Sequence, residues 1–590
     1  MGLLLPSLAL PRQGGGDRFR LGLHRRGRRD RFCMVLLSLL MAACSPGLSP
    51  TTRPEAPAAV NPDETRTLVF ATRHEPVYIS KRGLQSTAPG STGPALFDAG
   101  LAQSAGQGMP TELQLAEAFP QLGTDSWTVQ PDGRMQTTWR LQPNLTWHDG
   151  TPLTAEDFAF GYRVYRLPQF DGARLAGGFI ENVTAPNPRT VVIHWKSPYP
   201  SAAEDEGTVP ALPRHILAPT FERLGSDERL DSDAFAALPY WTDEFVGLGP
   251  YRLDKREPGA FIEGSAFDDY VFGKPKIGRL KLIWVADANT LVANVLFGAI
   301  QYIDASALEF EQALVLKRQW VAAGEGTIAY NPTKIRYVQI QYKPEYGSPA
   351  AVQDLRVRQA LAHAIDKQAL ADAMIDGEPG QADTFLSPLS PYFADLGRVL
   401  AKYPLDLRRF EQLMAEAGFT KDATGAYSQS GGTRFTPELA AFSGQGEKEA
   451  LILHDSWKRA GVETSLRTIT PAQQRDLELV STYPAFRIEQ TNADNPGVHH
   501  ATSGCARAER AWVGSNRGCF SDPEYDRLWS TYLTALDKGE RASAHVQAMR
   551  LLGEKVAGMP LYYGYLITGF PTTLLGPTYG HTNIHEWRFK

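Results

Sequence analysis

The 590-residue sequence has little cysteine and lacks the short motifs that mark common enzyme classes. Only four cysteines occur, and no C-x-x-C pair accompanies them, which argues against a zinc site. The sequence has no G-x-S-x-G, H-E-x-x-H, P-loop or G-x-G-x-x-G motif, so the usual signals of hydrolases, zinc proteases, nucleotidases and dinucleotide-binding enzymes are missing. We therefore expect a protein that is not an enzyme and needs no cofactor and no metal ion.

Beyond residue 43 the chain also lacks a basic excess and any apolar run long enough to cross a membrane. Without the eight Arg and two Asp of residues 1–43, 52 basic and 63 acidic residues remain, a net charge of −11. An acidic protein is a poor partner for nucleic acid, so we expect no nucleic-acid binding. The length exceeds one ordinary core and predicts about three or four structural units.

Residues 1–43 have the composition of an export signal. Arginines crowd residues 18–31, and the apolar run MVLLSLLMAA at residues 34–43 is too short for a spanning helix of about 20 residues. The end of this run, Met41-Ala42-Ala43-Cys44, resembles a bacterial lipobox, which predicts cleavage after residue 43 and a lipid on Cys44. An ordinary signal peptide and twin-arginine export through Arg28-Arg29 are the alternatives.

Residues 44–64 are rich in Pro, Ala and Thr and have almost no bulky apolar residue. This composition predicts a lipid-anchored, flexible tether. With Cys33 in the signal and Cys44 at the lipid site, Cys505 and Cys519 remain as an even pair. A disulfide between them in an oxidising compartment would stabilise the fold by about 3 kcal/mol, and two separate thiols are the alternative.

The most informative segment is WRLQPNLTWHDGTPLTAEDFAFGYRVY at residues 139–165. Its first part alternates apolar and polar residues, which predicts a strand with one buried face. HDGTP then predicts a turn, because Gly allows positive φ and Pro fixes φ, and we expect His148 to stabilise it by a hydrogen bond. Thr154 predicts a helix N-cap, with Asp157 three residues later as an approximate capping box.

Periodicity indicates the other elements that matter below. Strands are predicted at residues 67–71, 190–195, 280–285, 335–342 and 462–469, and a hairpin at 127–147 turns at Asp132-Gly133. Helices are predicted near residues 95–101 and at 288–296, 356–374, 406–417 and 447–460, with Gly418 and Gly461 ending the last two. The alternation of strands and helices after residue 304 favours an α/β lobe.

Segment 139–165 resembles the signature of the family 5 extracellular solute-binding proteins, the dipeptide- and oligopeptide-binding components of ABC importers. Further segments resemble motifs of that family and follow in its order: VGLGPY at residues 246–251, FDDYVFGKP at 267–275, FGAIQYID at 297–304, DLRVRQALAHAIDK at 354–367, LMAEAGF at 413–419 and DPEYD at 522–526. The resemblance covers residues 67–590, nearly the whole chain after the predicted leader.

The resemblance implies an α/β fold of the periplasmic-binding-protein type, class II-like, with two lobes and an accessory subdomain on the first. The core of lobe I would comprise residues 65–100, 242–304 and 555–590. The accessory subdomain would comprise residues 101–241, and lobe II residues 305–554.

The resemblance also implies a function. The protein would capture a short peptide or similar small solute by hinge closure and deliver it to a membrane permease with associated ATPases. We expect an extracytoplasmic, lipid-anchored monomer. A surface receptor or chaperone-like interaction protein without an importer, and an importer of a nickel complex, a sugar or an opine, are the alternatives.

The resemblance places the ligand at residues 483–496, YPAFRIEQTNADNP. In peptide-binding relatives an Asp after this strand pairs with the ligand's α-ammonium, and Asp494 takes that position, although Thr491-Asn492 replace the relatives' preceding Trp. A carboxylate and an ammonium make a strong charge-assisted hydrogen bond, whereas an Asp before Pro also caps turns. The edge of the strand from Phe486 to Gln490 is a candidate for pairing with an extended ligand, and ordinary internal pairing is the alternative.

Trp512, between the two cysteines, is a further candidate to line the ligand cleft, with packing in the core or loop as the alternative. Arg356 and Arg358 are interpreted as scaffold residues that hold a helix against a strand. The histidine pairs His499-His500 and His581/His585 have possible metal-ligand spacing. We interpret them as surface-loop residues, because Gly580 and its neighbours disfavour a helix at the second pair.

Overall fold

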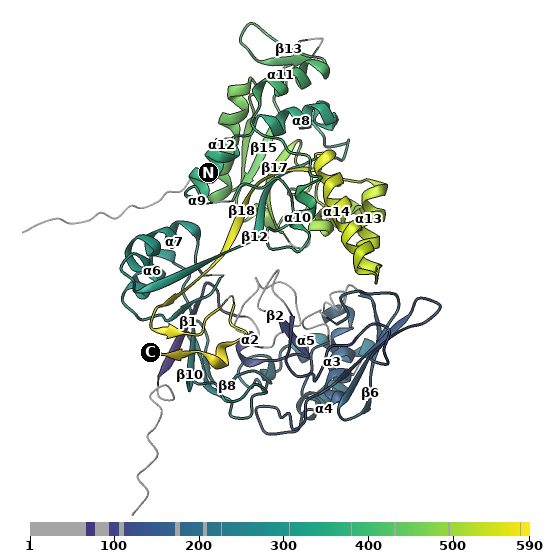
Figure 1. Ribbon diagram of the computed structural model, residues 1–590, viewed down its shortest axis with the longest axis vertical. Helices are drawn as coiled ribbons and strands as arrows, with labels where there is room; N and C mark the ends of the chain where they lie inside the picture. The colour runs from purple at the N-terminus through teal and green to yellow at the C-terminus, as the bar shows by residue number, and fades with distance from the viewer. Residues whose placement is uncertain are drawn as a thin grey trace, which may run out of the picture. The chain divides into compact units, whose positions relative to one another are not determined.

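A ten-stranded sheet carries the positions on which the candidate site depends (Figure 1). The computed structural model describes residues 66–76, 79, 94–104, 111–170, 178–203, 209–225, 227–305, 307–378, 380–429, 432–493, 496–578 and 580–590. The predicted leader, the predicted tether and Cys44 lie outside the described residues. Residues 60–590 group as one compact unit, and only this unit is described below.

The strands of the large sheet come from distant parts of the chain. Their order is β16 (Ser465–Ile469), β15 (Glu438–Phe442), β17 (Phe486–Asn492), β12 (Gly326–Ile340), β18 (Gly558–Pro571), β11 (Tyr302–Ile303), β1 (Thr67–Thr72), β10 (Arg279–Trp284), β9 (Phe261–Ala266) and β8 (Tyr251–Glu257). β1 pairs in parallel with β10 and β11, whereas β12 is antiparallel to both β17 and β18. The long strands β12 and β18 therefore join the two ends of the sheet.

Four shorter sheets contain the other strands of the described residues. Their strands are β4 (Trp127–Val129), β5 (Met135–Arg140), β7 (Thr190–Trp195) and β6 (Ile180–Asn187), the pair β2 (Ala102–Ser104) and β3 (Thr111–Leu113), the pair β13 (Phe419–Lys421) and β14 (Tyr427–Gln429), and the pair β19 (Leu574–Leu575) and β20 (Arg588–Phe589). The predicted hairpin is confirmed as β4–β5, and Gly133 at its turn has φ of 86°, which favours glycine. The strand that was predicted to begin at residue 139 is instead the end of β5, which stops at Arg140 before the signature turn.

The α-helices lie between these strands in the chain. They are α2 (Pro94–Phe97), α3 (Ala155–Tyr165), α4 (Arg214–Arg223), α5 (Ser232–Ala236), α6 (Ala288–Leu296), α7 (Phe310–Leu316), α8 (Leu355–His363), α9 (Lys367–Ile375), α10 (Phe393–Gly397), α11 (Leu407–Glu416), α12 (Gln445–Ala460), α13 (Pro523–Thr534) and α14 (Lys538–Glu554). Within the described ranges, none is both long and apolar enough to span a bilayer.

Two helix predictions are wrong in their extent. The single helix expected at residues 356–374 is two helices, α8 and α9, because Asp366 caps the second by accepting from the backbone N–H of Ala369 at 3.0 Å. An Asp side chain competes for backbone donors and so begins helices rather than continuing them. The helix expected near residues 95–101 ends at Phe97, whereas α6 has the predicted bounds.

Both faces of the sheet are buried around β12 and β17. Val338 and Ile488 point into a cluster that α8 and α12 cover, whereas Ile335 and Tyr337 point into a cluster that α13 and α14 cover on the opposite face. Strands buried on both faces are held in one register, because a shift of one residue would exchange the two faces. This region is therefore a fixed platform for the residues that follow.

Candidate functional site

Strand β17 is paired along its whole length on one side and only partly on the other. Its seven residues pair with β12 from Ile340↔Phe486 to Lys334↔Asn492, but β15 pairs only with Phe486 and Arg487. From Ile488 onward, no strand of the described residues pairs with the second side of β17. Backbone groups on such an open edge can pair with an added extended chain.

The direction of the backbone N–H groups identifies which residues serve this open side. Ala493 donates its N–H to the carbonyl oxygen of Thr333 on β12 at 2.9 Å, and alternate residues of a strand point the same way. Gln490 and Asn492 therefore direct their N–H groups away from β12. Gln490 N–H is instead satisfied by the carboxylate of its neighbour, Glu489, at 3.0 Å.

The four predicted residues of this segment do not share one environment. The side chains of Gln490 and Asn492 are exposed, and Asn492 Oδ1 accepts from Lys334 Nζ at 2.5 Å. Thr491 is on the opposite, buried face, where its hydroxyl has no hydrogen-bond partner among the described residues. Asp494 lies outside the described residues, so its role as ligand carboxylate stays a prediction.

Glu489 and Arg487 share a face of β17, and neither side chain was predicted as part of the site. The guanidinium of Arg487 is fully buried and pairs with the Glu489 carboxylate, and it donates to Gln339 Oε1 at 2.9 Å. Glu489 thus neutralises a buried cation with one oxygen and accepts from the open edge with the other. The alternation R-I-E in a strand was a usable signal, because residues two apart lie on one face.

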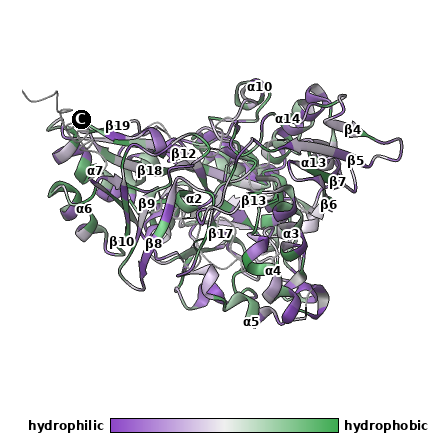
Figure 2. Ribbon diagram, turned by 90° about the horizontal axis from the view of Figure 1, so that it is seen from below, coloured by the Kyte–Doolittle hydropathy of each residue, from purple (hydrophilic) through white to green (hydrophobic). Residues whose placement is uncertain are grey.

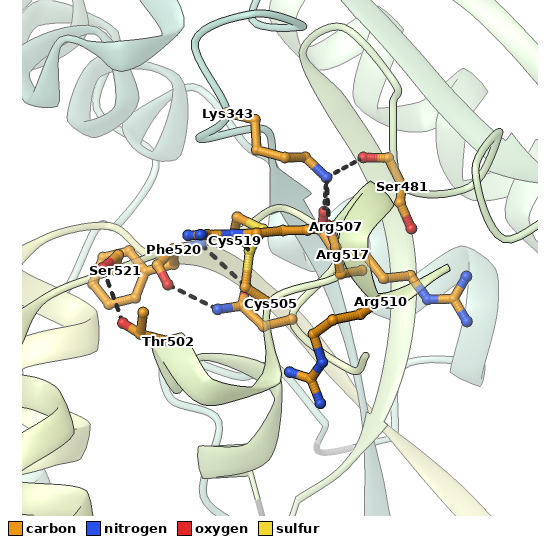
Figure 3. The surroundings of a disulfide bond; sticks show 12 residues. Lys343, Ser481, Thr502, Cys505, Arg507, Arg510, Arg517, Cys519, Phe520 and Ser521 are labelled. Atoms are coloured by element: carbon orange, nitrogen blue, oxygen red, sulfur yellow. Dashed lines mark hydrogen bonds between the residues drawn. A yellow bond between two sulfur atoms is a disulfide. The ribbon is translucent and has the colours of Figure 1, made fainter. Parts of the chain in front are cut away.

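The segment between Cys505 and Cys519 lies beside the end of β12 (Figure 3). A disulfide joins the two cysteines, whose Cα atoms are 4.8 Å apart. Within the loop, Trp512 is half-buried; its ring centroid is 6.1 Å from that of Tyr346, and Lys343 Nζ lies 5.1 Å from the indole centroid. These contacts account for its packing, and its predicted contact with a ligand stays a prediction.

Lys343 fastens this loop to the sheet, and nothing local in the sequence indicated that role. Its ammonium donates to Ser481 O at 2.7 Å, to Ala506 O at 3.1 Å and to Arg517 O at 3.0 Å. Burial lowers the pKa of Lys343 to about 8, because a cation loses hydration there. Three backbone carbonyls from separate segments therefore converge on one cation.

A third buried cation, Arg336 on β12, lies opposite Gln490 in the β12–β17 ladder. Arg336 Nε donates to Glu449 Oε1 of α12 at 2.8 Å, and the hydroxyl of Tyr562 on β18 donates to the same carboxylate. Burial, together with the Glu449 charge, holds the pKa of Tyr562 well above its usual value. This group fixes α12, β12 and β18 to one another directly behind the open edge.

The signature turn makes a structural contact rather than a catalytic one. His148 Nδ1 accepts from Gly247 N–H at 3.2 Å, and Nε2 donates to Gly249 O at 3.0 Å, so the turn is joined to the VGLGPY segment. Burial lowers the pKa of His148 to about 4.

Arg358, interpreted above as scaffold, donates to Gln353 O at 2.6 Å and to Lys555 O at 3.0 Å.

Two other kinds of site, a metal site and a small-molecule cavity, were compared with the described residues. In the part of the chain that the structure describes, no three His, Cys, Asp or Glu side chains are grouped to hold a metal ion. His500, interpreted above as a surface residue, is instead buried, at 3% exposed. A cavity of about 880 Å³ lies between α3 and β6, where Arg163 is already bound to Asp227 and Glu222. The cavity thus offers no free guanidinium at Arg163.

Comparison with known proteins gives one family. The sequence model of the bacterial extracellular solute-binding proteins, family 5 (middle region), matches residues 117–504. An ABC transporter peptide-binding protein of Brucella ovis is 28% identical over 303 residues, which are 50% of this chain and 51% of that protein. The oligopeptide-binding protein AppA of Bacillus subtilis is 24% identical over 94% of this chain and 97% of its own.

Solved structures agree with that match. AppA of Bacillus subtilis in complex with a nonapeptide has a TM-score of 0.67 at 20% identity and covers 89% of this chain and 99% of its own. NikZ of Campylobacter jejuni in complex with Ni(L-His) has the same TM-score, identity and coverage. This likeness establishes the fold as the two-lobe α/β fold of periplasmic binding proteins, as the sequence predicted.

Proposed function

Because the chain belongs to the bacterial extracellular solute-binding proteins of family 5, we propose that it captures a short peptide and delivers it to the membrane permease of an ABC importer. Proteins of this family are extracytoplasmic and bind substrates rather than transform them. The observation that carries the proposal is the open edge of β17 beyond Arg487. The match spans about half the length of the Brucella relatives, so substrate and partners are proposals.

An open strand edge suits a peptide better than it suits a compact solute. A peptide in extended conformation presents alternating N–H and C=O groups that pair with such an edge whatever its side chains are. At this edge Glu489 occupies the place of a peptide carbonyl by accepting from Gln490 N–H. We infer that an incoming peptide displaces this carboxylate oxygen while the other oxygen stays with Arg487.

Asp494 would fix the direction of the peptide. It follows β17 by two residues, so its carboxylate would lie at the end of the edge where the α-ammonium of a bound peptide would lie. A charge-assisted hydrogen bond there would favour peptides with a free amino terminus. Gln490 and Asn492, which are exposed on one face, would contact the first side chains of the peptide.

The pair β12–β18 supports a hinge between the two lobes. These strands pair from Gly326↔Pro571 to Gln339↔Gly558, and the register shifts between Asn331 and Lys334. Pro332 lies in that shift, where a missing N–H is tolerated. Register shifts bend strands locally, and closure of the lobes about this point would enclose the peptide.

Lipid anchoring through Cys44 completes the proposal. The disulfide between Cys505 and Cys519 supports an oxidising compartment outside the cytoplasm. A lipid on Cys44 would keep the protein at the membrane, close to the permease and its ATPases.

The decisive experiment identifies the ligand. Native mass spectrometry of protein purified without denaturation is expected to find a bound peptide, which is released unaltered on denaturation. Titration calorimetry then compares that peptide with its N-acetylated form on wild-type and Asp494→Asn protein. Acetylation and the substitution should each cost about 2–5 kcal/mol and should not add. A retained nickel complex or sugar, or no ligand and no binding from a panel of di- to pentapeptides, overturns peptide capture.

A further inference from the structure

The C-terminal tip of α6 exposes the most solvent-accessible large apolar side chain of the described residues. Phe297, directly after the helix, is 88% exposed, and Leu296 before it is 37% exposed. The opposite face of α6 is buried through Leu291, Val292 and Val295. No charged residue occurs from residue 288 to residue 303, so the α6 tip, defined here as residues 296–299, is apolar and uncharged. Figure 2 shows the α6 ribbon largely in the green of hydrophobic residues.

The α6 tip lies beside the point where the folded body begins. Gln301 donates its side-chain amide to Gly298 O at 2.8 Å, while its Oε1 accepts from Val69 N–H at 2.9 Å. Val69 is the third residue of β1, two residues after Thr67, or about 7 Å along the strand. Because α6 connects β10 to β11, which flank β1 in parallel, it returns the chain to the end where β1 starts (Figure 1).

The length of the chain before β1 limits how far this end of the sheet can lie from the lipid proposed on Cys44. The steps from Cys44 to Thr65 span at most about 75 Å when fully extended, so a lipid on Cys44 would keep this end of the sheet near the bilayer. Arg279, which is exposed and faces Thr67 across the β1–β10 ladder, makes no ion pair with any described residue. A free guanidinium at this end suits the phosphate groups of lipids.

We propose that the α6 tip inserts Phe297 and Leu296 into the interface of a lipid bilayer as a second membrane contact; this rests on the proposed anchoring at Cys44. The strength of an interfacial contact scales with the apolar area that it buries, so Phe297 and Leu296 would add to the attachment at Cys44. The tip has no hydrogen-bonding side chain, so it suits the hydrocarbon of a bilayer, which forms no hydrogen bonds. The occupant is therefore the bilayer.

The test uses the lipidated full chain with Phe297→Cys, labelled with an environment-sensitive fluorophore. The other thiols are occupied in the disulfide and the proposed thioether, so labelling is specific. Vesicles of phosphatidylethanolamine and phosphatidylglycerol carry a spin-labelled quencher lipid. Leu405→Cys is the matched control, because Leu405 is also exposed, at 53%, but lies before α11. We expect at least twofold quenching at position 297 and none at position 405.

Equal quenching at the two positions, or none at position 297, overturns the proposal. So does a response at position 297 that occurs only when the permease is reconstituted in the vesicles, because the tip would then contact protein. As a second measurement, the Leu296→Ser/Phe297→Ser double substitution in the unlipidated Cys44→Ala chain should lower vesicle partitioning about tenfold; no change contradicts insertion. The mass of the mature N-terminal peptide tests anchoring separately, and peptide retention tests ligand capture separately.

Discussion

Arg336 and Glu449 form an ion pair whose carboxylate is fully buried and whose guanidinium is 10% exposed. The two residues lie 113 positions apart and join β12 to α12 behind the open edge of β17. A buried charge without its partner is far less stable than the pair. This relationship gives the clearest stability prediction for the platform of the site.

Glu449→Gln should lower the free energy of unfolding by about 3–5 kcal/mol, because it leaves the Arg336 guanidinium buried without a counter-charge. The control is Lys448→Gln, which removes an exposed pair with Glu311 and should cost less than about 1 kcal/mol. Urea unfolding followed by circular dichroism measures both. Equal costs for the two variants would contradict a buried, tightly coupled pair.

Two buried histidines should respond oppositely to the same substitution. His545 has no hydrogen-bond partner for either ring nitrogen among the described residues, whereas His148 binds Gly247 N–H and Gly249 O. His545→Phe should therefore raise the free energy of unfolding by about 1–2 kcal/mol at pH 7, and His148→Phe should lower it by about 1–3 kcal/mol. Thermal unfolding of the two variants decides this, and a loss in both would show that the His545 ring is satisfied.

The same residues give a pH dependence. Burial lowers the pKa of both His148 and His545 to about 4. Between pH 6.5 and pH 4 these histidines are therefore protonated in the unfolded chain but neutral in the folded protein. Stability is thus present above pH 6.5 and is lost as pH falls toward 4, by about 3 kcal/mol for each histidine. Denaturant melts at pH 7, 5.5 and 4.5 should show a smaller loss for His545→Phe than for the wild type. Parallel curves would refute the shifted pKa.

The disulfide should stabilise the fold by closing a short loop. Cys505→Ser/Cys519→Ser removes the link across a separation of 14 residues and should cost about 3 kcal/mol. Dithiothreitol should destabilise the wild type by a similar amount and leave the double variant unchanged, which serves as the control. Because Lys343 still binds Ala506 O and Arg517 O, the double variant should fold. Full stability of the reduced wild type would contradict the prediction.

Local signals explain which parts of the fold were predictable. The bounds of α6 follow from an N-cap at Asp287, whose side chain accepts from Thr290 N–H at 2.7 Å, and from one apolar face. Gly418 and Gly461 end α11 and α12 with φ of 86° and 98°, as a left-handed C′ residue requires. Each of these signals lies within four residues of the helix end that it determines.

The site was less predictable because its main contacts are not local. Glu449 pairs with Arg336, which is 113 residues away in the sequence. Lys343 donates to Ser481 and Ala506, which are 138 and 163 residues away. No periodicity pairs such residues, since only the tertiary fold brings them together. Gln490 and Thr491 were grouped because they are adjacent, but adjacent residues of a strand face opposite sides.

The open edge itself can be tested by proline. Gln490→Pro removes an N–H that points away from β12, so it should cost little pairing within the sheet but should abolish retention of a peptide. Thr491→Pro removes an N–H on the β12 side and should unfold the strand, because proline cannot donate to the ladder. Native mass spectrometry reports the retained ligand, and circular dichroism reports the fold. A folded Gln490→Pro protein that keeps its peptide with unchanged affinity would show that ligand does not pair with β17 at this residue.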